Sequence, residues 1–144
     1  GGNNRTQMLR VARPGAIEDR TPDFSGSPYL GFTAALAAGL DGIERKLDPG
    51  EPNDMDLYIA PWAEIDRRGI KMLPHSLMES VHYLTQDEVL REAFGQVPID
   101  GPYGEPSDKT EAFVDHYARI KRAEYHEMTD IVTSHEISRY LRFP

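Results

Sequence analysis

The chain has 144 residues, 39% of them hydrophobic and 28% charged, which is the composition of an ordinary globular protein of one domain. Its 24 acidic and 16 basic residues give a net charge of −8, which argues against a nucleic-acid partner, because a nucleic-acid surface needs a basic stripe. There is no cysteine, so disulfides and thiolate chemistry are excluded. No stretch has the length and apolar character of a membrane span or a secretory signal. We therefore expect a cytoplasmic protein without a membrane partner.

Two short strands are predicted near the beginning of the chain. Hydrophobic and polar side chains alternate over Thr6–Ala12, and Ala16–Arg20 has the pattern of a second strand after a turn at 13–15. A three-residue loop sets Arg10 opposite Glu18. Because a hairpin alone is marginally stable and has unpaired edges, we expect it to belong to a larger sheet.

The rest of the chain is predicted to be mostly helical, so the fold class is α+β: a β-hairpin followed by about five helices. A first helix, buried on most sides, is expected from Pro28 to residue 46 with Ser27 as N-cap, and a Pro- and Asp-rich loop follows over Asp48–Trp62. Short helices are expected around 63–68 and 76–84, and a third starts at the capping box Thr85–Glu88 and stops at Gly95, before a loop over Gln96–Pro106. A long helix from Ser107 or Asp108, with an apolar stripe from Phe113 to Ile131, is followed by a last helix that is capped by Thr133 and runs to Leu141.

The candidate chemistry lies on the predicted hairpin. Strand periodicity places Arg10, Glu18 and Arg20 on one polar face. Arginines bind phosphate and carboxylate groups bidentately, and one carboxylate beside bound phosphates suits Mg²⁺. The alternative is a solvent-exposed ladder of salt bridges, which spacing alone favours because exposed ion pairs are common.

The other motifs in the sequence give weaker evidence of a functional site. The histidines lack the spacing of a zinc site, and neither a dinucleotide fingerprint nor a P-loop is present. Tyr58 lies in the predicted loop, where its ring is expected to be tucked under the chain as an anchor.

Four segments in a fixed order carry a family resemblance. "NNRTQMLRV", "IEDRTPD", "SPYLGFTAALAAGLDGIERKLDPGEPND" and "DLY" strongly resemble the C-terminal end of the catalytic domain of the glutamine synthetase family, and "FVDHYARIKRAEYHEMT" is similar to the last long helix of that family. The resemblance implies that residues 1–144 are a C-terminal fragment of a glutamine synthetase/guanidino kinase-like catalytic domain. It also implies a homo-oligomer of stacked rings for the full-length protein, and it would explain the hairpin with unpaired edges.

The resemblance further implies an activity and a set of site residues. Members phosphorylate the side chain of glutamate with ATP, in the presence of Mg²⁺ or Mn²⁺, and ammonia then displaces the phosphate to form the γ-amide. By position in the motifs, Arg5 corresponds to an arginine that contacts both ATP and glutamate, Arg10 to one that contacts the ATP phosphates, and Arg20 to one that binds glutamate. Arg5 and Arg20 are therefore the expected catalytic residues. Glu18 corresponds to a ligand of the metal that bridges the nucleotide phosphates.

Two departures from the family pattern leave alternatives open. Many members carry an arginine where this chain has Ala16, so one phosphate contact is missing or is supplied by Arg13. The hairpin turn is also short, and both features are similar to divergent branches that use methylamine or a polyamine in place of ammonia.

The other expectations concern activity and regulation. The remaining metal ligands of the family would precede residue 1, so the chain alone is expected to be inactive, and a non-catalytic assembly module is a further alternative. Tyr58 corresponds to a tyrosine that is adenylylated in some bacterial members, a modification that is not expected here.

Overall fold

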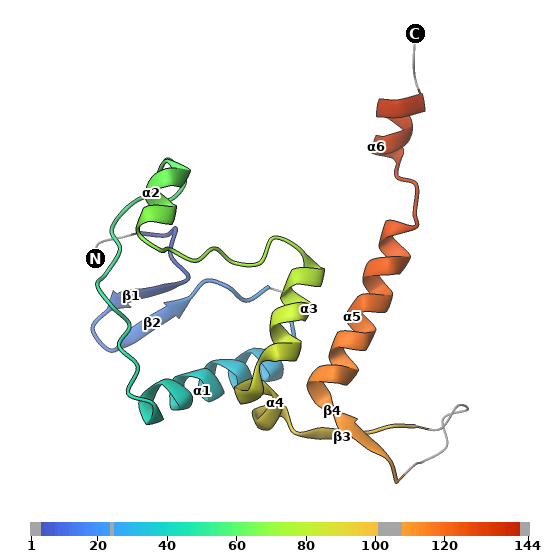
Figure 1. Ribbon diagram of the computed structural model, residues 1–144, viewed down its shortest axis with the longest axis horizontal. Coiled ribbons are helices and arrows are strands. Elements are labelled where there is room, and N and C mark those ends of the chain that lie inside the picture. The colour runs from blue at the N-terminus through green and yellow to red at the C-terminus, as the bar shows by residue number, and fades with distance from the viewer. Residues whose placement is uncertain (1–3, 24, 101–107, 142–144) are drawn as a thin grey trace. The chain divides into compact units, whose positions relative to one another are not determined.

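The computed structural model describes residues 4–23, 25–100 and 108–141 (Figure 1). The chain divides into two compact units, Gly1–Leu73 and Pro74–Pro144. The expected class is confirmed, because the described elements are mostly helices, with two small antiparallel sheets of two strands each. Within the described residues, no helix combines the length and apolarity needed to cross a membrane.

The first unit begins with the predicted hairpin, formed by β1 (Leu9–Arg13) and β2 (Ala16–Asp19). Arg10 pairs with Glu18, as expected. The turn differs from the prediction, because Arg13 pairs with Ala16 and leaves a two-residue loop. A register shift between Val11 and Arg13 absorbs the extra residue, so the predicted pairing survives the wrong loop length. Gly15 provides the positive φ of 77° that the tight turn requires.

Helix α1 (Pro28–Glu44) follows, and it begins and ends near the predicted positions. Pro28 stands in the first turn, where its missing N–H is not needed; Ser27 precedes it, but its side chain makes no capping hydrogen bond. At the other end Lys46 adopts a φ of 52°, and the amide of Leu47 donates to the carbonyl of Gly42 at 2.9 Å. This closure is a Schellman motif, which ends the helix without a glycine.

The prediction that this helix is buried on most sides is wrong for the chain itself. No residue of α1 is buried, and its apolar stripe is exposed along its length; the stripe consists of Tyr29, Phe32, Leu36, Leu40 and Ile43. Apolar periodicity reports which face a helix offers for packing, and not whether the same chain supplies the partner.

The predicted Pro- and Asp-rich loop is confirmed up to α2 (Trp62–Arg67), which starts at the last residue of the expected loop. Ile65 is the buried residue of this short helix. Tyr58 is 86% exposed, so the expectation of a tucked anchor is wrong.

The second unit packs α3 (Leu77–Gln86), α4 (Glu88–Phe94) and α5 (Phe113–Thr129) around a small core. Val81 on α3 and Val114 and Ala118 on α5 are buried there. The rings of Phe94 and Phe113 lie 5.1 Å apart between α4 and α5. The stripe predicted for the long helix is therefore only partly correct: Phe113 packs here, but the later members Ile120, Met128 and Ile131 are exposed, and Ile131 lies beyond the end of α5.

Three predicted boundaries in the second unit are wrong. Helix α4 is capped by Asp87, whose carboxylate accepts from the amide of Leu90 at 2.9 Å, while the hydroxyl of Thr85 donates to a carbonyl inside α3. The expected loop begins instead with strand β3 (Gln96–Pro98), paired with β4 (Thr110–Ala112). Because β4 occupies Thr110–Ala112, helix α5 starts at Phe113 and not at Ser107 or Asp108. Residues 99–100 have no regular structure, as expected for a loop, and 101–106 lie outside the described residues.

The last described elements are α6 (Ser134–Glu136) and the single-turn π-helix η1 (Ile137–Leu141) that follows it directly. The predicted cap is confirmed: the Thr133 hydroxyl accepts from the amide of Glu136 at 3.2 Å, and the Glu136 carboxylate accepts from the amide of Thr133 at 2.8 Å. Both bonds of a capping box are thus present.

Candidate functional site

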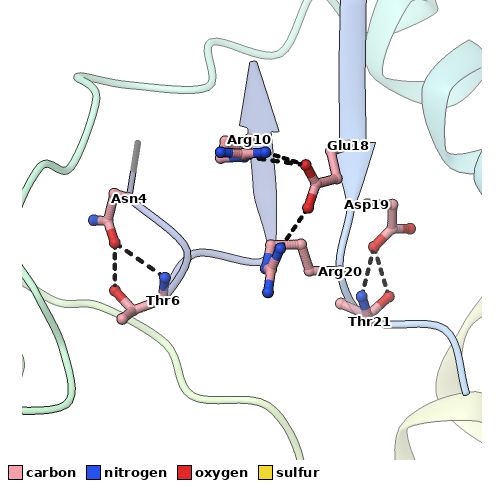
Figure 2. Close-up of polar contacts among 7 residues, drawn as sticks. All are labelled: Asn4, Thr6, Arg10, Glu18, Asp19, Arg20 and Thr21. Atoms are coloured by element: carbon pink, nitrogen blue, oxygen red, sulfur yellow. Dashed lines mark hydrogen bonds and ion pairs between the residues drawn. The ribbon is translucent and has the colours of Figure 1, made fainter. Parts of the chain in front are cut away.

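The polar face of the hairpin brings Arg10, Glu18 and Arg20 together, as the strand pattern predicts (Figure 2). Arg10 donates from Nε and Nη2 to Oε2 of Glu18, with the Nε contact at 3.1 Å, while Arg20 donates from Nη1 to Oε1. One carboxylate therefore bridges two guanidinium groups. The amide of Arg20 donates to the carbonyl of Met8 at 3.0 Å, which extends the strand pairing beyond β2 and holds Arg20 on the rigid part of the hairpin.

Both arginines act on the charge of Glu18. The hydrogen bond from Arg10, then that from Arg20, holds the pKa of the Glu18 carboxyl below its ordinary value, because both bonds stabilise the ionised form. The side chain of Arg10 is 17% exposed, and those of Glu18 and Arg20 are 34% exposed. The cluster is thus half-buried and open on one side, and Glu18 is an anion at any physiological pH.

Arg5 lies outside this cluster, on a segment that precedes β1. Its side chain is exposed and forms no ion pair or hydrogen bond with the described residues. Among the three candidate arginines, Arg5 thus differs from Arg10 and Arg20, whose charges Glu18 partly neutralises. The structure joins Arg10, Glu18 and Arg20 into one cluster and leaves Arg5 outside it.

Asn4 and Thr6, which flank Arg5, are tied to the loop before α2. The Asn4 Nδ2 atom donates to the carbonyls of Asn53 and Met55 at 3.0 and 2.9 Å. Its Oδ1 atom accepts from the amide and the hydroxyl of Thr6 at 3.0 and 2.7 Å (Figure 2). The Thr6 hydroxyl in turn accepts from the amide of Leu57 at 3.2 Å. Sequence reasoning missed both residues, and the one local signal was an amide and a hydroxyl two positions apart around an arginine.

Arg13 occupies the register position opposite Ala16. Residues that pair directly across antiparallel strands project from the same face of the sheet, so Arg13 belongs to the face that carries Glu18 and Arg20. The phosphate contact of Arg13 stays a prediction, and the register shows only the face on which Arg13 lies.

The donor set at this face fits a divalent cation as a partial site. A carboxylate offers about four lone-pair positions, and its hard oxygens suit Mg²⁺ or Mn²⁺, so Glu18 can accept from two arginines and still ligate a metal. Among the described residues, no group of three or more potential metal-ligating side chains exists. Glu18 would therefore supply one ligand, and further ligands would come from outside the described residues.

Comparisons with known proteins identify the family. The sequence profile described as "Glutamine synthetase, catalytic domain" matches residues 1–140. A glutamate–methylamine ligase of Methyloversatilis universalis is 39% identical over 143 residues, which cover 99% of this chain and 28% of the relative. A glutamine synthetase of Methanosarcina mazei is 33% identical over 142 residues, with 96% of this chain and 28% of the relative covered.

A solved structure supports the same assignment. The structure, described as a GmaS/ADP complex, matches with a TM-score of 0.74 and 36% identity, over 98% of this chain and 28% of its own. The chain thus spans little more than a quarter of the length of the proteins it matches. On the sequence match and the shared fold, this chain belongs to the glutamine synthetase catalytic-domain family.

Proposed function

We propose that this chain is the C-terminal part of a ligase that uses ATP to join an amine to the side-chain carboxylate of L-glutamate. The observation that carries the proposal is the cluster of Arg10, Glu18 and Arg20 on a rigid hairpin, in a chain of this family. Phosphoryl transfer requires cations and a metal ligand on one preorganised face, since charge is spread over the phosphate oxygens in the transition state.

The reaction consists of two displacements. A γ-carboxylate oxygen of glutamate attacks the terminal phosphorus of ATP and ADP leaves, which gives γ-glutamyl phosphate. The amine nitrogen then attacks the carbonyl carbon, phosphate leaves as the amide bond forms, and one N–H proton passes from the nitrogen to the phosphate or to solvent. Arg5 contacts both ATP and glutamate, Arg10 holds the ATP phosphates, and Arg20 holds the glutamate. Arg13 adds a phosphate contact from its position opposite Ala16.

Glu18 serves as a metal ligand in this proposal. A Mg²⁺ or Mn²⁺ ion at this position would neutralise negative charge on the nucleotide phosphates. Two arginines lower the pKa of the Glu18 carboxyl, so the group stays ionised and ready to ligate the metal at neutral pH.

Ammonia is the amine in the leading form of the proposal, since it is the substrate that the resemblance implies. A second candidate is a glutamate–amine ligase that uses methylamine or a polyamine. It is favoured by the match to the glutamate–methylamine ligase, whose 39% identity over 143 residues exceeds the 33% over 142 residues for the Methanosarcina enzyme.

The proposal extends to assembly and location. We expect the full-length protein to form a homo-oligomer of stacked rings, to bind neither nucleic acid nor membrane, and to reside in the cytoplasm. A non-catalytic assembly module, which keeps the architecture without turnover, is the alternative that the experiment below would detect.

Phosphate release by the full-length protein tests the proposal. The assay contains glutamate, ATP and Mg²⁺, and compares ammonium with methylamine and a polyamine. Release that depends on ammonium supports the leading form, and a preference for an alkylamine supports the second candidate. No release with any of the amines would refute the ligase proposal and favour the non-catalytic module.

A further inference from the structure

The side chain of Asn4 uses its complete hydrogen-bonding capacity to join two distant segments. A side-chain amide has two N–H donors and an oxygen that accepts two bonds. In Asn4 the nitrogen donates to two carbonyls of the loop before α2, and the oxygen accepts twice from Thr6. An exchange of nitrogen and oxygen would set donor against donor and acceptor against acceptor. The orientation of Asn4 is therefore determined by its partners.

Thr6 also bonds to the loop before α2, in this case as the acceptor. The amide of Leu57 donates to the Thr6 hydroxyl at 3.2 Å, and this hydroxyl donates to Asn4 Oδ1 at 2.7 Å. The two residues that flank Arg5 are thus bonded to a segment about fifty positions further along the chain, which agrees with the separations of 49 and 51 residues in these bonds.

The same local turn occurs elsewhere in this unit without such a connection. The Thr21 amide and hydroxyl donate to Asp19 Oδ1, and the Ser25 amide and hydroxyl donate to Asp23 Oδ1, at 2.7 to 2.9 Å. A carboxylate has no N–H, so neither aspartate can donate to a carbonyl as Asn4 does (Figure 2 shows Asn4–Thr6 and Asp19–Thr21). What distinguishes Asn4 is its long-range bonds and not the turn.

We propose that Asn4 and Thr6 are positioning residues that place Arg5 by anchoring its backbone to the loop over residues 53–57. The inference rests on the proposed function, in which Arg5 contacts both ATP and glutamate. Within the described residues the exposed Arg5 side chain makes no hydrogen bond or ion pair of its own, so the bonds of Asn4 and Thr6 set the place of its backbone. A backbone held in a fixed place keeps the flexible Arg5 side chain within reach of the anions, so less conformational entropy is lost when the guanidinium binds them.

Isosteric replacements in the full-length ligase test this inference. Asn4→Asp keeps the acceptor for Thr6 but replaces the amide that donates to the two loop carbonyls. Asp23→Asn is the matched control, because it makes the reciprocal change in a turn with the same local bonds. Thr6→Val removes the hydroxyl, and Thr6→Ser restores it. Each variant is made with and without Arg5→Ala, and kcat and KM for glutamate and ATP are measured by amine-dependent phosphate release.

We expect Asn4→Asp and Thr6→Val to lower kcat/KM about 10- to 100-fold, because a misplacement of about 1 Å has an effect of this size. Thr6→Ser and Asp23→Asn should stay within about 3-fold of the wild type, and in the Arg5→Ala background Asn4→Asp should cost less than about 3-fold, because residues that act as one unit are not additive. Equal losses in both backgrounds, or an equal loss in Asp23→Asn, would overturn the inference while wild-type turnover leaves the proposed function intact. An inactive wild type would instead refute the proposed function, and the inference with it.

Discussion

The substitution Glu18→Gln tests whether Glu18 acts as a metal ligand or only as part of a structural salt bridge. Glu18 presents one carboxylate oxygen to Arg10 and the other to Arg20. Glutamine keeps the shape but has one oxygen, so one arginine loses its acceptor and faces an amide nitrogen. The charge that would ligate a divalent metal is removed at the same time.

The structure sets the expected size of the effect. The carboxylate is open to solvent on one side, so the loss of its ion pairs has a small effect on unfolding. The effect on activity should be larger, because an interaction that stabilises charge in the transition state contributes about 10²–10³-fold to kcat. We expect such a loss in the full-length ligase, together with a rise of about 10- to 100-fold in the Mg²⁺ concentration for half-maximal activity.

Glu64 provides the matched control for this experiment. It also accepts from two arginines, Arg67 at 2.7 and 2.8 Å and Arg68 at 2.6 Å, and its side chain is 27% exposed. Glu64→Gln makes the same chemical change at a similar cluster that has no proposed role in catalysis. The assay is phosphate release over a Mg²⁺ titration. If Glu18→Gln and Glu64→Gln gave the same kcat and Mg²⁺ dependence as the wild type, the hairpin cluster would be a salt-bridge ladder and the metal assignment would be wrong.

Three further predictions concern the fold. Val114→Ala removes two methyl groups from a fully buried site, so denaturant titration should show a loss of about 2–3 kcal/mol from transfer and cavity terms, against nearly none for the exposed Met128→Ala. Gly95 has a φ of 65° and a ψ of −140°, which side chains rarely tolerate; Gly95→Ala should cost about 1–3 kcal/mol, whereas Gly31→Ala inside α1 should not destabilise the chain. The hydrogen bonds from Arg67, then Arg68, lower the pKa of Glu64 to about 2. The contribution of these bonds to stability is therefore complete above the ordinary value of 4.5 and is lost as the pH falls through about 2. An NMR titration should place the midpoint near that value and nearer 4.5 in Arg67→Gln; an ordinary midpoint in the wild-type chain would contradict the bonds.

The features predicted correctly from the sequence depend on neighbours along the chain. Strand alternation placed Arg10 and Glu18 on one face, and the turn at Pro14 and Gly15 left few ways to pair them. The start of α1 at Pro28 and the capping box at Thr133 are equally local, since each involves one turn of backbone. Such features are formed by the same residues that signal them.

The features that sequence reasoning missed depend on residues far apart. Strand β3 exists because its three residues pair with Thr110–Ala112, and a single valine beside a proline is too weak a local signal to predict a strand. The capping box expected at Thr85 lost to Asp87, since α3 extends through Thr85 to Gln86. Helix boundaries depend on such competition between nearby caps.

The candidate site divides in the same way. The sequence by itself determined that two arginines and a glutamate share one face of a hairpin, because a period of two is built into every strand. Only the tertiary structure decided that Asn4 holds the backbone beside Arg5 against Asn53 and Met55. Those bonds join the Asn4 side chain to backbone carbonyls about fifty positions away. Because every residue has a carbonyl, no pattern of side chains in the sequence predicts which carbonyls are bonded.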